Sequence, residues 1–356
     1  AETNEEGSAA AVVTVPQAQL EPLDDPQCLR LVDDLFACPT LQPWAILNQI
    51  RGRYWTGNYF TNIGPILVTV NPYTTKTPLY TDANKQRYLD SAAEDPHLWA
   101  VAERVYRKVL RAGNQCVLVS GESGSGKTFS IRVITSFLAD ISTQHAPEHE
   151  QEDARRVAYM QPKVGTILEA FGNAKTRRNR DSSRFAKFAK LKFNGSGYLC
   201  GCETEQHLLE VSRVVKHPQG ERSFHIFYQL YACHAGTYSL ERCKDWLFQG
   251  CTPKQWEADA EGRALAVSQS AELEDSFKTL GFGEAELKQV YDVVAGIMHL
   301  LTVNFIPMDT QREPGAALEG DGEQWLKYVA ELWQVDEAQL LSKLVNTVRQ
   351  VGGDSI

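Results

Sequence analysis

One twelve-residue stretch constrains this chain more than any other, namely VLVSGESGSGKT at residues 117–128. A glycine, four further residues and then Gly-Lys-Thr form the spacing of a P-loop. The apolar run at 116–119 predicts a short buried strand before the loop, and apolar residues at helical spacing from 131 to 138 predict a helix after it. A Gly/Ser-rich surface loop, the alternative, explains neither flank. We therefore expect this stretch to bind the phosphates of a nucleotide.

The residue types in this loop suit phosphate chemistry. Glycines let successive backbone N–H groups point at phosphate oxygens, and the start of a helix adds partial positive charge. Lys127 is expected to reach the β- and γ-phosphates, and the Thr128 hydroxyl to ligate Mg²⁺. The predicted phosphate-binding residues are Gly121, Glu122, Ser123, Gly124, Ser125, Gly126, Lys127 and Thr128.

Size and charge narrow the class of protein. The 356 residues suffice for one large or two ordinary domains. A net charge of −9 argues against a nucleic-acid or anionic-membrane partner. No apolar stretch reaches the ~18 residues of a membrane span, and the start of the chain lacks the apolar region of a signal peptide. The eight cysteines include the pair Cys200 and Cys202 but no second pair for a metal site, so we expect reduced thiols in a cytosolic protein.

The rest of the chain alternates strand and helix patterns. Residues 1–26 are Ala/Glu/Pro-rich and predict a disordered leader. The polar segment 144–156 predicts a long surface loop, and 307–322 a polar gap. Helices are predicted near 41–54, 98–110, 164–171, 224–230, 287–301, 325–332 and 340–344, a buried strand at 64–70, and a hairpin from 185–193 and 198–209. This alternation favours an α/β fold with a mostly parallel central sheet. His299 lies on an apolar helical stripe, which favours a core histidine over a ligand.

A second motif, NAKTRRNRDSSRF at residues 173–185, selects among P-loop proteins. It resembles switch I of the myosin motor head, NAKTxxNxNSSRFGK. Further stretches match the same family in the same order: NPY at 71–73 with PLY at 78–80, DPHLWAVA at 95–102, LEAFG at 168–172, LLEVSRVV at 208–215, ERSFHIFYQL at 221–230 and MHL at 298–300. The resemblance runs from about Asp33 to the end of the chain.

The resemblance implies roles for single residues. Ser183 would be the second protein ligand of Mg²⁺, and Ser182 would position the attacking water or relay its proton. Asn179 would contact the phosphates, and Arg184 would act in the closed state of the site. The residues implied to hold the adenine are Asn71, Pro72, Tyr73 and Tyr80.

Four departures from the family pattern lie near this chemistry. Asp181 stands where the family has Asn, which places a negative charge near the phosphates that Arg180 or shared Mg²⁺ coordination could offset. The other three departures are Ala186 for Gly, Val211 for Lys and Leu301 for Gly. A switch II segment, DIxGFE, is not found. We therefore expect Arg184 to lack its carboxylate partner, and the relay, converter and lever of a motor to lie outside these residues.

The resemblance implies an incomplete P-loop NTPase core with a helical upper-cleft subdomain, spanning residues 27–356. It also implies ATP and Mg²⁺ as ligands and actin filaments as partner. Light chains or calmodulin would bind an absent lever, and the location would be cytoplasmic, at the actin cytoskeleton. In the family the loop matching 144–156 tunes nucleotide release. A non-hydrolysing nucleotide-binding scaffold is the alternative. A P-loop kinase or GTPase would need a motif such as NKxD, which the sequence lacks.

Overall fold

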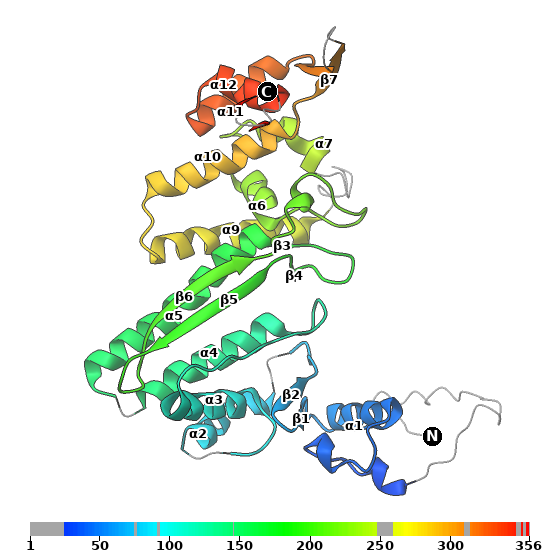
Figure 1. Cartoon of the computed structure of the whole chain (residues 1–356), viewed down its shortest axis with the longest axis vertical. Helices are drawn as coiled ribbons and strands as arrows, with labels where there is room; N and C mark the ends of the chain where they lie inside the picture. The colour runs from blue at the N-terminus through cyan, green and yellow to red at the C-terminus, as the bar shows by residue number, and fades with distance from the viewer. Residues whose placement is uncertain are drawn as a thin grey trace, which may run out of the picture. The chain divides into compact units, whose positions relative to one another are not determined.

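The computed structural model describes residues 25–74, 77–90, 93–144, 146–247, 259–309, 314–346, 350–351 and 354–355. The chain divides into two compact units, Ala1–Val101 and Ala102–Ile356. Figure 1 labels the α-helices and most of the strands of both units. The leader predicted for residues 1–26 lies outside the described residues except at Asp25 and Pro26, where a 3-10 helix, η2 (Pro26–Leu29), begins.

The first unit is organised by a helix and a small hairpin. A second 3-10 helix, η3 (Leu35–Ala37), precedes α1 (Pro43–Trp55), and β1 (Phe60–Ile63) pairs antiparallel with β2 (Ile66–Thr69). The buried Arg53 of α1 joins helix to strand, since its Nη2 donates to the carbonyl of Phe60 at 2.8 Å. The helix predicted at 41–54 is confirmed. The strand predicted at 64–70 is also present, but Ile66 is 61% exposed because β1 and β2 form an isolated pair rather than a buried sheet.

An aromatic cluster completes the first unit. It involves η4 (Pro78–Tyr80), α2 (Asp82–Asp90) and the start of α3 (Leu98–Ala112). The His97 ring lies 4.9 Å from that of Phe60, stacks on Tyr88 and accepts a hydrogen bond at Nδ1 from the backbone N of Trp99. Burial lowers the pKa of His97 to about 4, so the ring is neutral at physiological pH.

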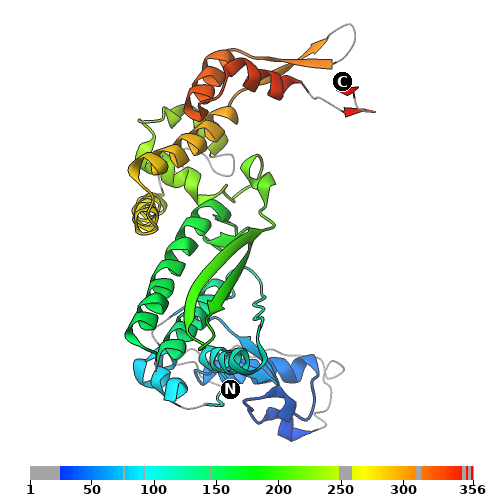
Figure 2. The ribbon, with the colours of Figure 1, turned by 60° about the vertical axis from the view of Figure 1, so that its left-hand side comes forward.

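In the second unit two long helices cover a hairpin. Helix α4 (Lys127–Thr143) packs on α5 (Glu148–Gly172), and α5 lies along the hairpin of β5 (Ala186–Phe193) and β6 (Leu199–His207), as Figures 1 and 2 both show. Leu199, at the start of β6, is fully buried against Ala139 of α4 and Ala154 of α5. The predicted hairpin and P-loop helix are confirmed.

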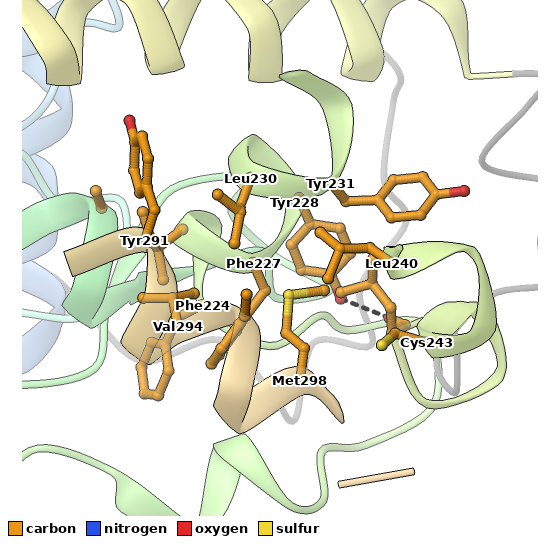
Figure 3. Packing of buried hydrophobic residues seen from close by; sticks show 14 of the residues in the cluster. Phe224, Phe227, Tyr228, Leu230, Tyr231, Leu240, Cys243, Tyr291, Val294 and Met298 are labelled. Atoms are coloured by element: carbon orange, nitrogen blue, oxygen red, sulfur yellow. Dashed lines mark hydrogen bonds between the residues drawn. The ribbon is translucent and has the colours of Figure 1, made fainter. Parts of the chain in front are cut away.

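A set of helices forms the largest core of this unit. Its elements are η5 (Val211–Val214), α6 (His225–His234), η6 (Leu240–Cys243), α7 (Lys244–Leu247), α9 (Ala260–Thr279), α10 (Glu284–Leu300), α11 (Gly322–Trp333) and α12 (Glu337–Val345). Side chains of α6, such as Phe227 and Leu230, meet Val294 and Met298 of α10 (Figure 3). His299 is a core histidine as predicted, because Nε2 lies 2.7 Å from the carbonyl oxygen of Tyr238.

The prediction of a long surface loop at 144–156 is wrong. Within its described residues, α5 begins at Glu148, and Ala154 is only 1% exposed. Glu148 and Glu150 lie in the first turn, where carboxylates favour a helix. The Glu150 carboxylate also accepts hydrogen bonds from Nδ2 of Asn194, in the hairpin turn, at 3.0 Å. The hairpin lies some forty residues later in the sequence. Its contacts therefore hold this segment in a helix, although the polar sequence of the segment predicts a loop.

Two further expectations are corrected. Residues 116–119 belong to none of the strands that the structure describes, and Leu118 is 87% exposed, because no described strand supplies backbone hydrogen bonds to them. The polar gap predicted at 307–322 overlaps β7 (Phe305–Asp309) and contains β8 (Pro314–Leu318), and these two strands pair antiparallel.

The remaining strands are short: β3 (Asn173–Ala174), β4 (Ser182–Ser183), β9 (Gln350–Val351) and β10 (Asp354–Ser355). Every sheet formed by the described residues is two-stranded and antiparallel, so the mostly parallel central sheet stays a prediction. Within the described ranges, no helix combines the length and the apolar character that a membrane span requires.

Candidate functional site

The P-loop forms a tight turn at the start of α4. Gly124 and Gly126 have φ angles of +83° and +91°, a region that favours glycine, and α4 starts directly after Gly126. A Cβ on Gly121 would lie 2.5 Å from Oγ of Ser125, so a side chain at this position would require Ser125 to shift. These glycines allow the backbone to curl in front of a helix N-terminus, which is the arrangement that binds phosphate.

The two polar residues at the start of α4 differ in their contacts. Nζ of Lys127 donates to the carbonyl oxygens of Gly121 at 2.8 Å and Glu122 at 2.9 Å, so the ammonium lies against the loop itself. Thr128 is exposed. Both side chains therefore belong to the loop and its immediate helix turn, as the P-loop pattern predicts.

The structure brings the P-loop into contact with the 173–185 loop. Oγ of Ser123 donates to Oγ of Ser182 at 2.9 Å, and Nδ2 of Asn179 donates to Oγ of Ser123 at 3.4 Å. These residues are 59 and 56 positions apart in the sequence. Two predicted parts of one phosphate site, recognised separately in the sequence, thus meet in space.

Local pairing fixes the shape of the 173–185 loop. Its two ends pair as β3 and β4, with Asn173 opposite Ser183. At its tip, the backbone N of Thr176 donates to the carbonyl of Asn179 at 2.8 Å, and the Asn179 side chain donates to the carbonyl of Asp181 at 2.8 Å. The loop therefore presents Asn179 and Ser182 to the P-loop from a closed frame, while Ser183 is exposed.

Arg184 pairs with a carboxylate, Glu210, although the switch II carboxylate that the resemblance assigns to it is not found in the sequence. Its Nε donates to Oε2 of Glu210 at 2.6 Å, and its Nη1 lies 3.4 Å from Oγ of Ser182. Glu210 also accepts from Nε of Arg213 at 2.9 Å. Burial by itself would raise the pKa of Glu210, but hydrogen bonds from the two arginines outweigh it and hold the pKa below its usual range.

The carboxylate of Asp181 bonds other residues of the chain rather than Arg180. Its Oδ1 accepts from Nδ2 of Asn173 at 2.9 Å and lies 3.0 Å from Nε2 of His225, at the start of α6. Burial acts to raise the pKa of Asp181, and these two hydrogen bonds act more strongly to lower it. Arg180 instead pairs with Glu261 at 3.3 Å, so the predicted offset by Arg180 is wrong.

The residues predicted to hold adenine lie in the first unit. The Asn71 side chain accepts from the backbone N of Tyr73 at 2.9 Å, which fixes the turn through Pro72, and Tyr73 is 82% exposed. Tyr80 belongs to the aromatic cluster, with its ring 5.8 Å from that of Trp99, and burial raises its pKa to about 12. The predicted phosphate-binding residues belong to the second unit, and both the phosphate role and the adenine role stay predictions.

The residues present fit a magnesium–nucleotide complex. The P-loop offers a glycine cradle that a Cβ would fill, and Thr128 and Ser183 offer hydroxyl oxygens. Among the described residues no cluster of three His, Cys, Asp or Glu side chains could hold a metal alone. Mg²⁺ at nucleotide sites is held by few protein oxygens and by the phosphates, so hydroxyl donors suffice.

Sequence reasoning missed three residues beside the site, namely Glu210, Arg213 and His225. Each lies in a stretch that matched the family, but the match by itself assigned them no contact. The spacing of Glu210 and Arg213, three residues apart, was a signal for an ion pair within one helical turn. Their contacts with the 173–185 loop depend on the tertiary fold.

Comparison with known proteins agrees with this geometry. Residues 32–356 match the family model described as myosin head (motor domain). A probable myosin heavy chain of Encephalitozoon cuniculi is 33% identical over 340 residues, covering 93% of this chain and 19% of that protein. Myosin-3 of Caenorhabditis elegans is 32% identical over 96% of this chain and 17% of its own length. Myosin ID heavy chain of Dictyostelium discoideum is 35% identical over 86% of this chain and 27% of its own length.

Proposed function

The chain belongs to the myosin head (motor domain) family, and from this premise we propose that it is the nucleotide-binding part of an actin-based motor that hydrolyses ATP to ADP and phosphate. It spans only 17% to 27% of the length of the three relatives described above. The proposal therefore concerns the intact protein, of which these residues would supply the phosphate site.

One observation carries the proposal. The hydroxyls of Ser123, in the P-loop, and Ser182, in the 173–185 loop, are joined by a 2.9 Å hydrogen bond. Hydrolysis of a nucleotide needs groups that hold the phosphates next to groups that orient the attacking water. A P-loop that served only to bind nucleotide would not need a second loop of hydroxyl, amide and guanidinium groups against it.

The roles divide by residue type. Lys127 and the loop N–H groups would bind the β- and γ-phosphates, and Asn179 would add an amide donor. Thr128 and Ser183 would hold Mg²⁺, which when bound neutralises charge on the phosphate oxygens. Ser182 would orient the attacking water, and Arg184 would stabilise negative charge that develops in the transition state. Asn71, Pro72, Tyr73 and Tyr80 would hold the adenine.

Family membership supports the partners as well. Actin filaments would be the track, with light chains or calmodulin on a lever beyond these residues. The location would be cytoplasmic, at the actin cytoskeleton. The residues described here would supply the nucleotide site and the helical part of the upper cleft rather than the whole actin-binding surface.

Substitution of Lys127 tests the nucleotide site. Hydrogen bonds to charged groups contribute about 1.5–3 kcal/mol, so Lys127→Ala in the intact protein should weaken MgATP binding by about tenfold to a hundredfold. A fluorescent-nucleotide titration measures this, with Lys108→Ala, an exposed lysine on α3, as control. Equal affinity in the two variants would contradict the phosphate assignment.

The same titration, combined with stopped-flow turnover, separates the other roles. Ser183→Ala should weaken Mg²⁺-dependent binding, whereas Ser182→Ala and Arg184→Ala should spare binding and slow hydrolysis. Equal loss of binding in all three variants would contradict the division of roles. Tight binding without turnover in the unsubstituted protein would instead favour a nucleotide-binding scaffold.

A further inference from the structure

The carboxylate of Glu210 connects the 173–185 loop to the buried part of the second unit. Glu210 directly precedes η5, and its backbone N donates to the carbonyl of Arg184 at 2.9 Å. Its Oε2 accepts from Nε of Arg184 at 2.6 Å and from Nε of Arg213 at 2.9 Å. Side chain and backbone of one residue therefore hold the same segment of the 173–185 loop.

Arg213 makes this anchor rigid. Its side chain is 3% exposed, and its Nη2 lies 3.0 Å from Oε2 of Glu221. Its Nη1 donates to the carbonyl of Arg222 at 3.0 Å, and its own carbonyl accepts from Oγ of Ser223 at 3.1 Å. A cation fixed on several sides fixes the Glu210 carboxylate in turn, because a buried guanidinium cannot move away without losing these hydrogen bonds.

The position of Glu210 also decides how Arg184 is oriented. Nε of Arg184 is bound by Glu210, and Nη1 is directed to Oγ of Ser182 at 3.4 Å. Ser182 in turn accepts from Ser123 of the P-loop. Since a guanidinium is planar, a hydrogen bond at Nε together with one at Nη1 sets the plane of the whole group.

We propose that Glu210 is a positioning residue of the phosphate site, which holds the Arg184 guanidinium beside Ser182 through an anchor fixed by Arg213. Glu210 acts through Arg184 and does not touch substrate. The inference rests on the proposed function, because it gives Arg184 its orientation for the hydrolytic step. Preorganised charge is effective because it needs no rearrangement as the reaction proceeds.

Glu210→Gln in the intact protein tests this, because glutamine keeps the size of the side chain and removes its charge. We expect ATP turnover to fall by about tenfold to a hundredfold, because a small displacement of a catalytic group can slow a reaction by that much. MgATP affinity should stay within about twofold, because the P-loop is unchanged. Glu210→Asp, which restores the charge on a shorter side chain, should recover part of the turnover.

Glu203→Gln is the matched control. Glu203 is an exposed carboxylate on β6 that pairs with Lys192 of β5 and takes no part in the contacts of Glu210, Arg213 and Arg184 given above, so this variant should leave turnover unchanged. Combining Glu210→Gln with Arg184→Ala should reduce turnover little further than Arg184→Ala does. Hydrogen exchange at residues 182–185 should rise in Glu210→Gln and not in Glu203→Gln.

The outcomes separate the inference from the function beneath it. Unchanged turnover in Glu210→Gln, an equal loss in Glu203→Gln, or additive effects with Arg184→Ala would each overturn the positioning role. Absence of ATP turnover in the unsubstituted protein would overturn the proposed function instead. A loss confined to Glu210→Gln, partly recovered by Glu210→Asp, supports the inference.

Discussion

Single charged residues near the proposed phosphate site have partners that the sequence motif does not reveal. Asp181 departs from the family pattern, yet its carboxylate bonds Asn173 and His225 rather than being left uncompensated. Arg184 similarly bonds Glu210. The departure at Asp181 is thus accommodated by a link from the 173–185 loop to the start of α6, a contact between residues 44 positions apart.

This link predicts that part of the folding stability is lost at acid pH. The pKa of Asp181 lies below its usual value in the folded chain, since the hydrogen bonds from His225 and Asn173 outweigh burial. A carboxyl with a lowered pKa stabilises the fold above the unfolded-state value of about 4, and this stabilisation is lost as pH falls through the folded pKa. Asp181→Asn should therefore flatten the fall of melting temperature below about pH 4.

Melting curves from pH 7 to pH 3, followed by circular dichroism, measure that difference. Asp153→Asn is the control, because Asp153 is an exposed carboxylate on α5. If the two variants and the unsubstituted chain lost stability in parallel over this range, the hydrogen bonds of Asp181 would make no measurable contribution to folding stability.

At the scale of elements, the sequence predicts those segments whose apolar residues repeat regularly. The helix at 98–110, the P-loop helix and the hairpin around 194–197 carry clear periodic or turn signals, and all three form. Helix α9 was not predicted, because its buried face includes small and polar residues such as Ala266 and Ser270. The strand expected at 116–119 fails for a different reason, since strands depend on neighbours that local sequence does not specify.

In the candidate site, too, features with a local sequence signal could be predicted and contacts that depend on the tertiary fold could not. The turn of the P-loop could be predicted because glycine spacing encodes its geometry locally. The anchoring of Arg184 by Glu210 and Arg213 could not, because the contact between Arg184 and Glu210 joins residues 26 positions apart and depends on how β6 leads into η5.

Helix α5 provides a prediction that reverses the expectation of a loop at 144–156. Ala154 is buried against Ala139 and Leu199, so Ala154→Asp would place a carboxylate in an apolar contact. We expect the free energy of unfolding to fall by about 2–4 kcal/mol. Denaturant unfolding measures this, with Glu152→Asp on the exposed face of the same helix as control. Equal tolerance of both substitutions would indicate a surface segment after all.

At the scale of the whole molecule, the described surface includes aliphatic side chains that a soluble protein would normally cover. Leu118, before the P-loop, is 87% exposed, and Leu208, between β6 and η5, is 88% exposed. Val211 and Val215 beside Leu208 are also largely exposed. Both segments lie next to parts of the proposed phosphate site. Leu118 precedes the P-loop, and Leu208 precedes Glu210, which anchors Arg184. Exposed aliphatic groups of this kind mark either a contact surface or a liability to aggregate.

The chain expressed on its own should therefore self-associate. It should also show no actin-activated ATP turnover, because no switch II segment is found in its sequence. Leu118→Ser combined with Leu208→Ser should shift it toward monomer, because each substitution removes an exposed aliphatic side chain without touching the hydrogen bonds of the site. Size-exclusion chromatography with light scattering measures the mass, and Val267→Ser, a half-exposed valine on α9, is the control. A chain that is already monomeric, and whose ATP turnover rises when actin filaments are added, would show that these side chains are harmless exposures and that residues 1–356 contain a complete catalytic site.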